Sequence, residues 1–293
     1  MQQENNRPVI VLGRGYVGGM LASFLEAIGR DNFPIARSEL DYHDTVRFGT
    51  LLDTVKPKSV VIAFGYTGSP NVDECERNPE LTRLLNVTVP LQIARMCVDR
   101  NIHCVALSSG CVFDGYDKEY AERDLPNNGI FSATSSVYCR SKHSLELALD
   151  GLPVSIIRLR MPYCGRLSTR NYLMKLLRYK KILNRVNSKS YMIDVVRYID
   201  VIAQRDRPEL TTYHHAVNPN PLPMAELLAM YEEHGLARPD WELVDDIDTV
   251  ATRSNCVLLS SGFRSLSPFA SERECIALSL KRIAYRKRVG NLL

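Results

Sequence analysis

The chain has 293 residues, a length that fits one large domain or two modest ones. Apolar residues make up 45 % and charged residues 24 %, as in an ordinary globular protein. The net charge of +4 is mild, and the one dense basic run, 281–288, is typical of a solvated helix end. No apolar run approaches the roughly 20 residues of a membrane span, and the polar start, 1–7, lacks a secretion-signal core. We therefore expect a cytoplasmic protein that binds neither nucleic acid nor membranes.

The eight cysteines form no Cys-x-x-Cys pair and no cluster with histidine at zinc-binding spacing. The sequence therefore predicts no metal site. Several cysteines, such as Cys97 and Cys104, lie inside apolar runs. We expect most of them to be reduced thiols in the core.

A glycine-rich turn follows the first predicted strand, 8–12, and leads into a predicted helix, 20–28. A strand, Gly-x-Gly-x-x-Gly and a helix form the dinucleotide-binding pattern. The glycines let the backbone approach a pyrophosphate, and the helix N-terminus favours an anion. The sequence therefore predicts a nucleotide cofactor, held by Gly13, Arg14, Gly15, Tyr16, Val17 and Gly18.

The second predicted strand, 33–36, ends at Arg37 rather than at an acidic residue. An acid at this point would bind the ribose diol of NAD, whereas a cation accommodates the 2′-phosphate of NADP. The sequence therefore favours NADPH, with Arg14 as a second cation. Glu39 is close enough to keep NADH as an alternative.

The chain then alternates helices with short apolar strands. We predict helices at 44–55, 80–99 and 141–149, a loop at 69–79, and strands at 59–63, 103–107 and 154–160. This alternation predicts an α/β fold, a doubly wound parallel sheet of the Rossmann type with helices on both faces. Ligands bind at the carboxyl ends of such strands, which is where we place Gly13, Ala63, Ser109 and Cys111.

Three polar side chains follow in an order that suits ketone reduction. Tyr138 and Lys142 stand four residues apart and share one helix face. A phenol beside an ammonium has a lowered pKa, so it can exchange a proton near neutral pH. Ser109 could hold the same substrate oxygen. Tyr-x-x-x-Lys alone is weak evidence, and a surface pair is its alternative. The preceding glycine turn and Ser109 favour the catalytic interpretation.

The pattern loosens beyond Tyr163, where we predict helices at 170–181, 192–203, 224–234 and 272–288 and a strand at 213–217. We expect residues 1–163 to form an NADP-binding Rossmann domain, to which 192–218 returns. Residues 164–293 should form a smaller mixed domain that covers the cleft and supplies the substrate site.

The assembled features resemble the extended short-chain dehydrogenase/reductases that reduce 4-keto nucleotide sugars, the dTDP-4-dehydrorhamnose reductase group. Within it, the chain is most similar to the bifunctional UDP-4-keto-6-deoxyglucose 3,5-epimerase/4-reductases. The resemblance spans nearly the whole chain. It depends on Gly-Ser-Pro-Asn-Val-Asp-Glu-Cys-Glu at 68–76, Gly-Cys-Val-Phe at 110–113, Arg-Leu-Arg-Met-Pro at 158–162, Arg-Asn-Tyr at 170–172, Asn-Pro at 218–219 and Arg-Ser-Asn at 253–255. The glycine turn departs from the group's pattern, since it is one residue shorter.

The resemblance implies a catalytic set. Ser109, Tyr138 and Lys142 would carry out the reduction, and Cys111 would exchange the C3 and C5 protons as the epimerising relatives do. Lys175 matches the lysine expected on the opposite face of the sugar. The alternative for Cys111 is a small core residue, and for Lys175 it is a solvated or phosphate-facing lysine.

The resemblance also implies the binding residues. Beside the glycine turn and Arg37, the cofactor would contact Ala63, Gly65, Tyr138 and Lys142. The substrate candidates are Thr67, Asn71, Asn86, Asn171 and Arg253. The substrate would be a nucleotide-diphosphate sugar made by an upstream 4,6-dehydratase, with UDP, dTDP and GDP all open as the nucleotide. A homodimer is one arrangement left open.

Two alternatives to the bifunctional enzyme remain. One is a reductase that acts on an already epimerised sugar, and the other is a non-catalytic NADP-binding regulatory subunit. The presence of Ser109, Tyr138 and Lys142 argues against the regulatory subunit. Cys111 favours the bifunctional enzyme over the plain reductase.

Overall fold

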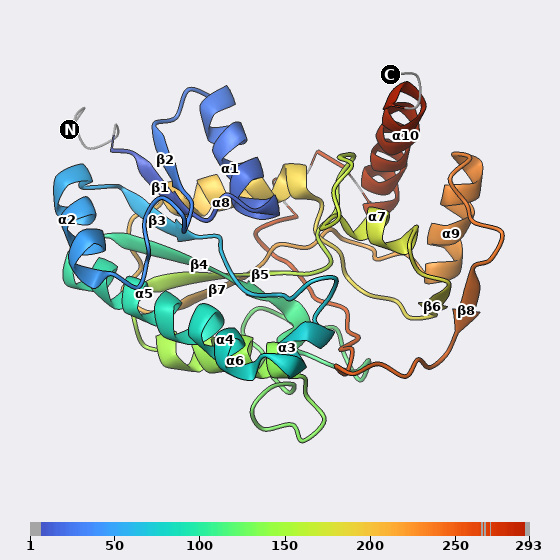
Figure 1. Cartoon of the computed structure of the whole chain (residues 1–293), viewed down its shortest axis with the longest axis horizontal. Coiled ribbons are helices and arrows are strands. Elements are labelled where there is room, and N and C mark those ends of the chain that lie inside the picture. Colours follow the sequence, from blue (N-terminus) through green and yellow to red (C-terminus); the bar gives the residue numbers. More distant parts are fainter. Residues whose placement is uncertain (1–6, 265, 267, 270, 291–293) are drawn as a thin grey trace.

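The computed structural model describes residues 7–264, 266, 268, 269 and 271–290. The polar start at 1–6, part of the basis for expecting no secretion signal, lies outside these residues. Figure 1 shows a central sheet between two layers of helices, with further helices and a small two-stranded sheet towards the C-terminal side. Within the described ranges, no helix has both the length and the apolar character needed to cross a membrane.

The central sheet is six-stranded and parallel throughout, in the order β2-β1-β3-β4-β5-β7. The first strand, β1, lies in the interior of the sheet. The next strand, β2, is added on one side of it, and β3 and all later strands are added on the other side, as in a doubly wound sheet. The predicted α/β fold is therefore confirmed. The strands are β1 Val9–Leu12, β2 Asn32–Ile35, β3 Ser59–Ile62, β4 His103–Ser109, β5 Val154–Leu159 and β7 Thr212–His215.

Helices cover both faces of the sheet (Figure 1). Alternate residues of β1 show why: Val9 and Val11 belong to one apolar cluster, and Ile10 and Leu12 to another. Strands buried on both faces are apolar at every position, which explains their compact apolar runs. The first cluster includes residues of α1 Tyr16–Ala27 and α8 Met192–Gln204, and the second includes residues of α2 Thr45–Val55, α5 Val89–Asp99 and α6 Val137–Leu149.

Two predicted helices begin earlier than expected. The helix predicted at 20–28 is α1, which starts at Tyr16 directly after the glycine turn. The helix predicted from 141 is α6, which starts at Val137 because the Ser136 hydroxyl accepts a hydrogen bond from the backbone of Cys139. Tyr138 therefore lies inside the helix that carries Lys142.

The segment between β3 and β4 contains more helix than expected. The predicted loop 69–79 includes the short helix α3 Asp73–Arg77. The predicted helix 80–99 consists of α4 Pro79–Arg83 and α5, joined by a π-helical turn at Leu84–Thr88. Such turns inside helices often lie at functional sites.

The prediction of a helix at 170–181 is wrong for most of this range. Only α7 Tyr172–Leu176 forms. Its end is held from outside, because the Trp241 indole donates to the carbonyl of Leu176 and Arg238 donates to that of Leu177. The chain then enters β6 Lys181–Leu183, which pairs in parallel with β8 Glu242–Val244. The remaining helices are α9 Met224–Glu233 and α10 Glu272–Gly290.

A buried ion pair ties three elements together near the carboxyl edge of the sheet. The guanidinium of Arg158 on β5 binds the carboxylate of Glu146 on α6, with a shortest distance of 2.7 Å. The hydroxyl of Ser108 on β4 donates to the same carboxylate at 2.6 Å. Both charged side chains are almost completely buried. This network fixes α6 against the strand that ends at Ser109.

Replacing Glu146 by glutamine should lower the free energy of unfolding by about 3–5 kcal/mol, because Arg158 would become a buried cation without its counter-charge. Urea unfolding followed by circular dichroism measures this. The control is Asp53→Asn, which removes the carboxylate from a surface pair with Arg100 and should leave the unfolding midpoint unchanged. Equal effects of the two substitutions would contradict the role given to the buried pair.

Candidate active site

The glycine turn has the shape that a pyrophosphate requires. Gly13 has a φ of +100°, and a Cβ added to it would lie 2.9 Å from the Cβ of Phe64. A Cβ added to Gly18 would lie 1.9 Å from the carbonyl oxygen of Gly13, so α1 packs on the turn at a distance that only glycine allows. Gly15, the N-cap of α1, has open space around it and no side-chain cap. The backbone at Gly15 is therefore accessible to an anion at the helix N-terminus.

The side chains of Tyr16 and Val17 face the core instead. The Tyr16 hydroxyl lies 3.1 Å from the sulfur of Cys164, and burial raises the pKa of the phenol. Val17 packs against the apolar cluster of α1 and α8, as does Ala63 at the end of β3. Both side chains are therefore partly used in packing inside the protein.

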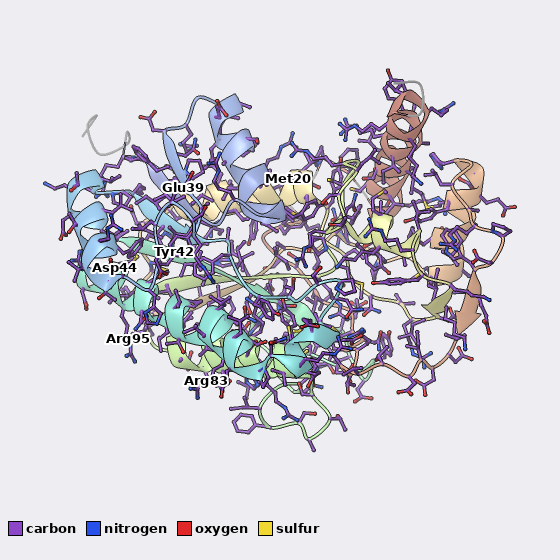
Figure 2. The ribbon with its side chains drawn as sticks, in the orientation of Figure 1. Met20, Glu39, Tyr42, Asp44, Arg83 and Arg95 are labelled. Atoms are coloured by element: carbon purple, nitrogen blue, oxygen red, sulfur yellow. The ribbon has the colours of Figure 1, made fainter. Side chains whose placement is uncertain are left out.

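The charged residues after β2 are arranged around Glu39, which Figure 2 labels beside Tyr42. Arg14 forms an ion pair with one carboxylate oxygen of Glu39 at 2.9 Å, and the backbone of Ala36 donates to the other at 2.7 Å. Both bonds lower the pKa of Glu39, and the bond from the Ala36 backbone has the larger effect. Arg14 is therefore partnered within the protein, while Arg37 is exposed. This leaves Arg37 as the better candidate for an incoming phosphate.

Ser109, Tyr138 and Cys111 come together at the carboxyl end of β4. The Ser109 hydroxyl accepts a hydrogen bond from the backbone of Cys111 at 3.2 Å and also hydrogen-bonds to the Tyr138 phenol. Burial raises the pKa of Tyr138 well above its usual value, Cys111 raises it further, and the Ser109 bond only partly opposes this. Tyr138 is consequently a protonated phenol at neutral pH, suited to giving a proton.

The expectation that Lys142 lowers the pKa of Tyr138 is wrong for this structure. The Lys142 ammonium is almost fully buried and donates to the carbonyl of Leu107 at 3.2 Å. Burial lowers the pKa of Lys142 itself. A Cβ added to Gly65 would lie 3.5 Å from the Lys142 nitrogen, so the predicted cofactor residues Gly65 and Lys142 do adjoin each other.

Cys111 has a thiol neighbour that could not be expected from the sequence pattern. Its side chain hydrogen-bonds to Cys139, which follows Tyr138 on α6. Burial and this bond raise the pKa of Cys111, whereas the same bond lowers the pKa of Cys139. Arg160 also acts on both thiols by lowering their pKa. Of the two thiols, Cys139 is therefore the easier to ionise.

Asn86 and Asn171 are not substrate contacts in this structure, because both side chains are fully buried and fully engaged. Asn86, in the π-helical turn, binds the backbone N–H and carbonyl of Tyr66 at 2.7 and 2.9 Å and also donates to Ser141 on α6. Asn171 caps α7 and donates to the carbonyls of Cys164 and Arg166. Asn86 thus positions the loop after β3 against α6, and Asn171 shapes the start of α7.

An open pocket of about 370 Å³ lies at the loop after β3. Thr67, a predicted substrate residue, contributes to it and accepts a hydrogen bond from Arg170 at 3.0 Å. Asn71, just beyond, uses its side-chain oxygen to accept from the backbone of Asp73. The pocket is lined by Gly65, Tyr66, Thr67, Gly68, Ser69, Glu74 and Arg170.

Lys175 and Arg253 lie in a cationic group near this pocket. Burial lowers the pKa of Lys175, and Arg170, Arg253 and Arg178 lower it further. Arg253 itself pairs with Asp73 at 2.8 Å, so its charge is partly compensated. A lysine in such surroundings releases its proton more easily than an isolated one. Arg170 and Asp73 were not among the predicted site residues, because only the fold brings α7 and α3 together here.

The geometry defines a class of protein. A glycine turn after β1 of a parallel sheet, with a serine at the end of β4 facing a tyrosine and a lysine on α6, is the arrangement of a short-chain dehydrogenase/reductase. More narrowly, the chain belongs to the RmlD substrate binding domain family, whose profile matches residues 7–194.

Relatives of known activity are similar over most of the chain. It is 29 % identical over 230 residues to the bifunctional dTDP-4-dehydrorhamnose 3,5-epimerase/dTDP-4-dehydrorhamnose reductase of Arabidopsis thaliana, which covers 75 % of this chain and 72 % of that protein. It is 28 % identical over 238 residues to a trifunctional UDP-glucose 4,6-dehydratase/UDP-4-keto-6-deoxy-D-glucose 3,5-epimerase/UDP-4-keto-L-rhamnose-reductase of the same plant. That match covers 78 % of this chain but 34 % of the trifunctional protein.

Solved structures share the fold. The UDP-rhamnose synthase of Acanthamoeba polyphaga mimivirus superposes with a TM-score of 0.80 at 23 % identity, over 94 % of this chain and 99 % of that one. The dTDP-4-dehydrorhamnose reductase of Bacillus anthracis, solved in complex with NADP, superposes with a TM-score of 0.75 at 18 % identity, over 96 % of this chain and 98 % of that one.

Two glycine substitutions should separate folding from nucleotide binding. Gly18→Ala forces its Cβ into the Gly13 carbonyl, so it should lower the free energy of unfolding by about 1–3 kcal/mol and weaken dinucleotide binding. Gly15→Ala has room in the protein, so it should leave stability unchanged while its Cβ obstructs the pyrophosphate. Urea unfolding and a fluorescence titration with NADPH measure the two properties. Unchanged affinity in Gly15→Ala would rule out pyrophosphate contact at this backbone.

Proposed function

We propose that this protein reduces the C4 ketone of a UDP-linked 4-keto-6-deoxy sugar with NADPH, after epimerising C3 and C5, and so makes UDP-rhamnose. The observation that carries the proposal is the meeting of Ser109, Tyr138 and Cys111 at the end of β4. An acid for the alkoxide and a thiol for the neighbouring carbon-bound protons are then present at one place. Relatives named as epimerase/reductases and a fold shared with a UDP-rhamnose synthase support it.

The reduction step needs a proton donor at the C4 oxygen. When bound, NADPH supplies the hydride. Tyr138, which burial keeps protonated, gives its proton to the developing alkoxide, and Ser109 holds the phenol by a hydrogen bond. Lys142 places a buried ammonium beside Gly65. This ammonium would hold the nicotinamide ribose of the cofactor by a hydrogen bond.

The epimerisation steps use the same oxygen. The protons on C3 and C5 are acidic because the enolate places its charge on the C4 oxygen, where Tyr138 and Ser109 donate hydrogen bonds. Cys111 would exchange these protons on one face of the sugar. Cys139 ionises more easily than Cys111, so Cys111 starts as the protonated thiol and would give its proton to the enolate carbon, which leaves a Cys111 thiolate as the base for the next exchange. Lys175, with its lowered pKa, would act from the opposite face.

Arg37 supports NADPH over NADH as the cofactor. Glu39, the acid that would bind the ribose diol of NADH, has both carboxylate oxygens engaged by Arg14 and the backbone of Ala36. The exposed Arg37 remains to receive the 2′-phosphate. The cradle at Gly13, Gly15 and Gly18 fits the pyrophosphate of either dinucleotide.

The substrate would come from a 4,6-dehydratase acting earlier, since the ketone at C4 and the missing 6-hydroxyl are the products of that reaction. The trifunctional relatives combine a dehydratase with these activities in their names, and this chain matches 34 % of one of them. We further propose a cytoplasmic enzyme.

Product analysis with substituted enzymes tests the two-step reaction. The purified protein is incubated with UDP-4-keto-6-deoxyglucose and NADPH, the absorbance at the nicotinamide band is followed, and the sugar is identified by NMR. Wild type should give UDP-rhamnose. Tyr138→Phe should reduce the rate by about 10²–10⁴-fold because the proton donor is lost. When the reaction is run in deuterated water, Cys111→Ala should abolish the incorporation of deuterium at C3 or C5.

A control and two other results complete this experiment. Cys97→Ala removes a buried thiol near the C-terminal end of α5 and should change neither the reduction nor the epimerisation. NADPH consumption only when an epimerised ketone is supplied would show a plain reductase and overturn the epimerase part. Binding of NADPH without turnover of any keto sugar would overturn the enzyme reading and favour a regulatory subunit.

Cofactor choice can be tested separately. Arg37→Ala should raise KM for NADPH at least about tenfold and leave KM for NADH nearly unchanged, because only NADPH carries the 2′-phosphate. Arg83→Ala is the matched control, since Figure 2 labels this exposed arginine on α4, away from the nucleotide turn. Equal effects on both cofactors would contradict a phosphate contact at Arg37.

A further inference from the structure

A second pocket lies at the edge of the sheet opposite the active site. Its volume is about 280 Å³. Arg7 precedes β1, Lys58 precedes β3 and His103 opens β4, so the pocket is at the amino ends of these strands, whereas Ser109 and the glycine turn are at the carboxyl ends. It is lined by Arg7, Lys58, Asn101, His103, Arg205, Asp206 and Arg207.

The pocket concentrates positive charge. Four cationic side chains line it, and Asp206 is the one carboxylate among the lining residues. Asp206 pairs with Lys58 at 2.9 Å, but its side chain is 99 % exposed, so it lies at the rim. The three arginines of the lining are thus close together with little compensation. Like charges gathered in a concave site raise the local concentration of anions.

One buried polar side chain of the lining lacks a good partner on one ring nitrogen, and two further unsatisfied groups belong to residues next to the lining in the chain. His103 is 2 % exposed, and its Nε2 is bonded to Ser155 at 2.9 Å. Its Nδ1 has no well-formed hydrogen bond, although the backbone of Arg205 lies close enough to raise its pKa slightly. The buried hydroxyl of Ser59, opposite His103 in the β3–β4 register, and the amide nitrogen of Gln204 also lack partners. Buried polar atoms without partners cost free energy unless a ligand or water satisfies them.

We propose that this pocket is a phosphate-binding site, separate from the catalytic cleft and independent of the function proposed above. Guanidinium groups bind phosphate oxygens through paired hydrogen bonds, and Arg7, Arg205 and Arg207 converge here. The pocket volume of about 280 Å³ is just below the range of about 300–1,000 Å³ that is usual for ligand sites, so the pocket fits a phosphate or diphosphate group better than a whole dinucleotide. The ligand is either free phosphate or pyrophosphate, or the phosphate of a nucleotide.

The histidine gives the site a spectroscopic reporter. Burial, with further contributions from the cations Lys58, Arg207 and Arg205, lowers the pKa of His103 to about 4. A phosphate between these cations and the ring would offset their effect. The His103 imidazole signals should therefore move when phosphate binds, and the signals can be assigned by their loss in His103→Gln.

Calorimetric titration of the full chain tests the site. NADP⁺ is kept saturating so that the dinucleotide turn is filled, and inorganic phosphate, pyrophosphate and UMP are titrated in low-salt buffer. We expect pyrophosphate or UMP to bind, and Arg205→Gln and Arg207→Gln each to weaken that binding at least about tenfold. Arg95→Gln, an exposed arginine on α5 that Figure 2 labels, should leave it unchanged. Only binding that both arginine substitutions weaken is counted, because UMP held in the catalytic cleft would not respond to them. Tighter binding of this kind by pyrophosphate identifies free phosphate as the ligand class, and by UMP it identifies a nucleotide.

Either of two results would overturn the proposal. One is the absence of binding by all three compounds up to about 10 mM, a concentration at which even a weak site is detected. The other is binding that neither arginine substitution changes while both variants keep the unfolding midpoint of the wild type. Because Arg205 is exposed, its replacement should not impair folding. The His103 signals of the unsubstituted protein provide a second readout, and a lack of movement with saturating pyrophosphate would also contradict the site.

Discussion

All six strands of the main sheet run in one direction, and this constraint determines where chemistry can take place. Their carboxyl ends meet at one edge, which brings together the glycine turn after β1, the loop after β3 and Ser109 at the end of β4. Residues far apart in the sequence, such as Gly13 and Ser109, thus lie at one edge of the sheet. The amino ends meet at the opposite edge, where basic residues that precede the strands collect with the end of α8. One sheet therefore offers two chemically different edges.

Several side chains at the active-site edge are buried, and their hydrogen bonds hold this edge together. Asn86 uses its entire amide to hold Tyr66 and Ser141, which closes the loop after β3 over α6. Burial then favours the neutral forms of Tyr138, Cys111 and Lys142, raising the pKa of the first two and lowering that of the third. A change of charge on any of these three groups therefore costs more free energy here than it would in water.

Much of the fold could be predicted from the sequence because local patterns determine it. The buried strands are short apolar runs, and the glycine turn is dictated by distances that no side chain could satisfy. The end of α7 could not be predicted, because it is fixed by Arg238 and Trp241, some sixty residues away. The substrate roles expected for Asn86 and Asn171 also failed because of contacts between distant residues. A family motif identifies these asparagines, but it does not show that their side chains are already hydrogen-bonded within the protein. Cys139 gave no signal, since only the packing of α6 on β4 brings it to Cys111.

The attachment that ends α7 also gives the protein an intrinsic optical probe. Trp241 is the single tryptophan of the chain, its indole nitrogen donates to Leu176, and its ring packs edge-on against Tyr231 with centroids 5.2 Å apart. Leu176 is the neighbour of Lys175. Ultraviolet emission from the indole therefore originates at one point beside α7 and is free of contributions from other tryptophans. Its wavelength and intensity would follow the movement of α7 in real time, without any label attached to the protein.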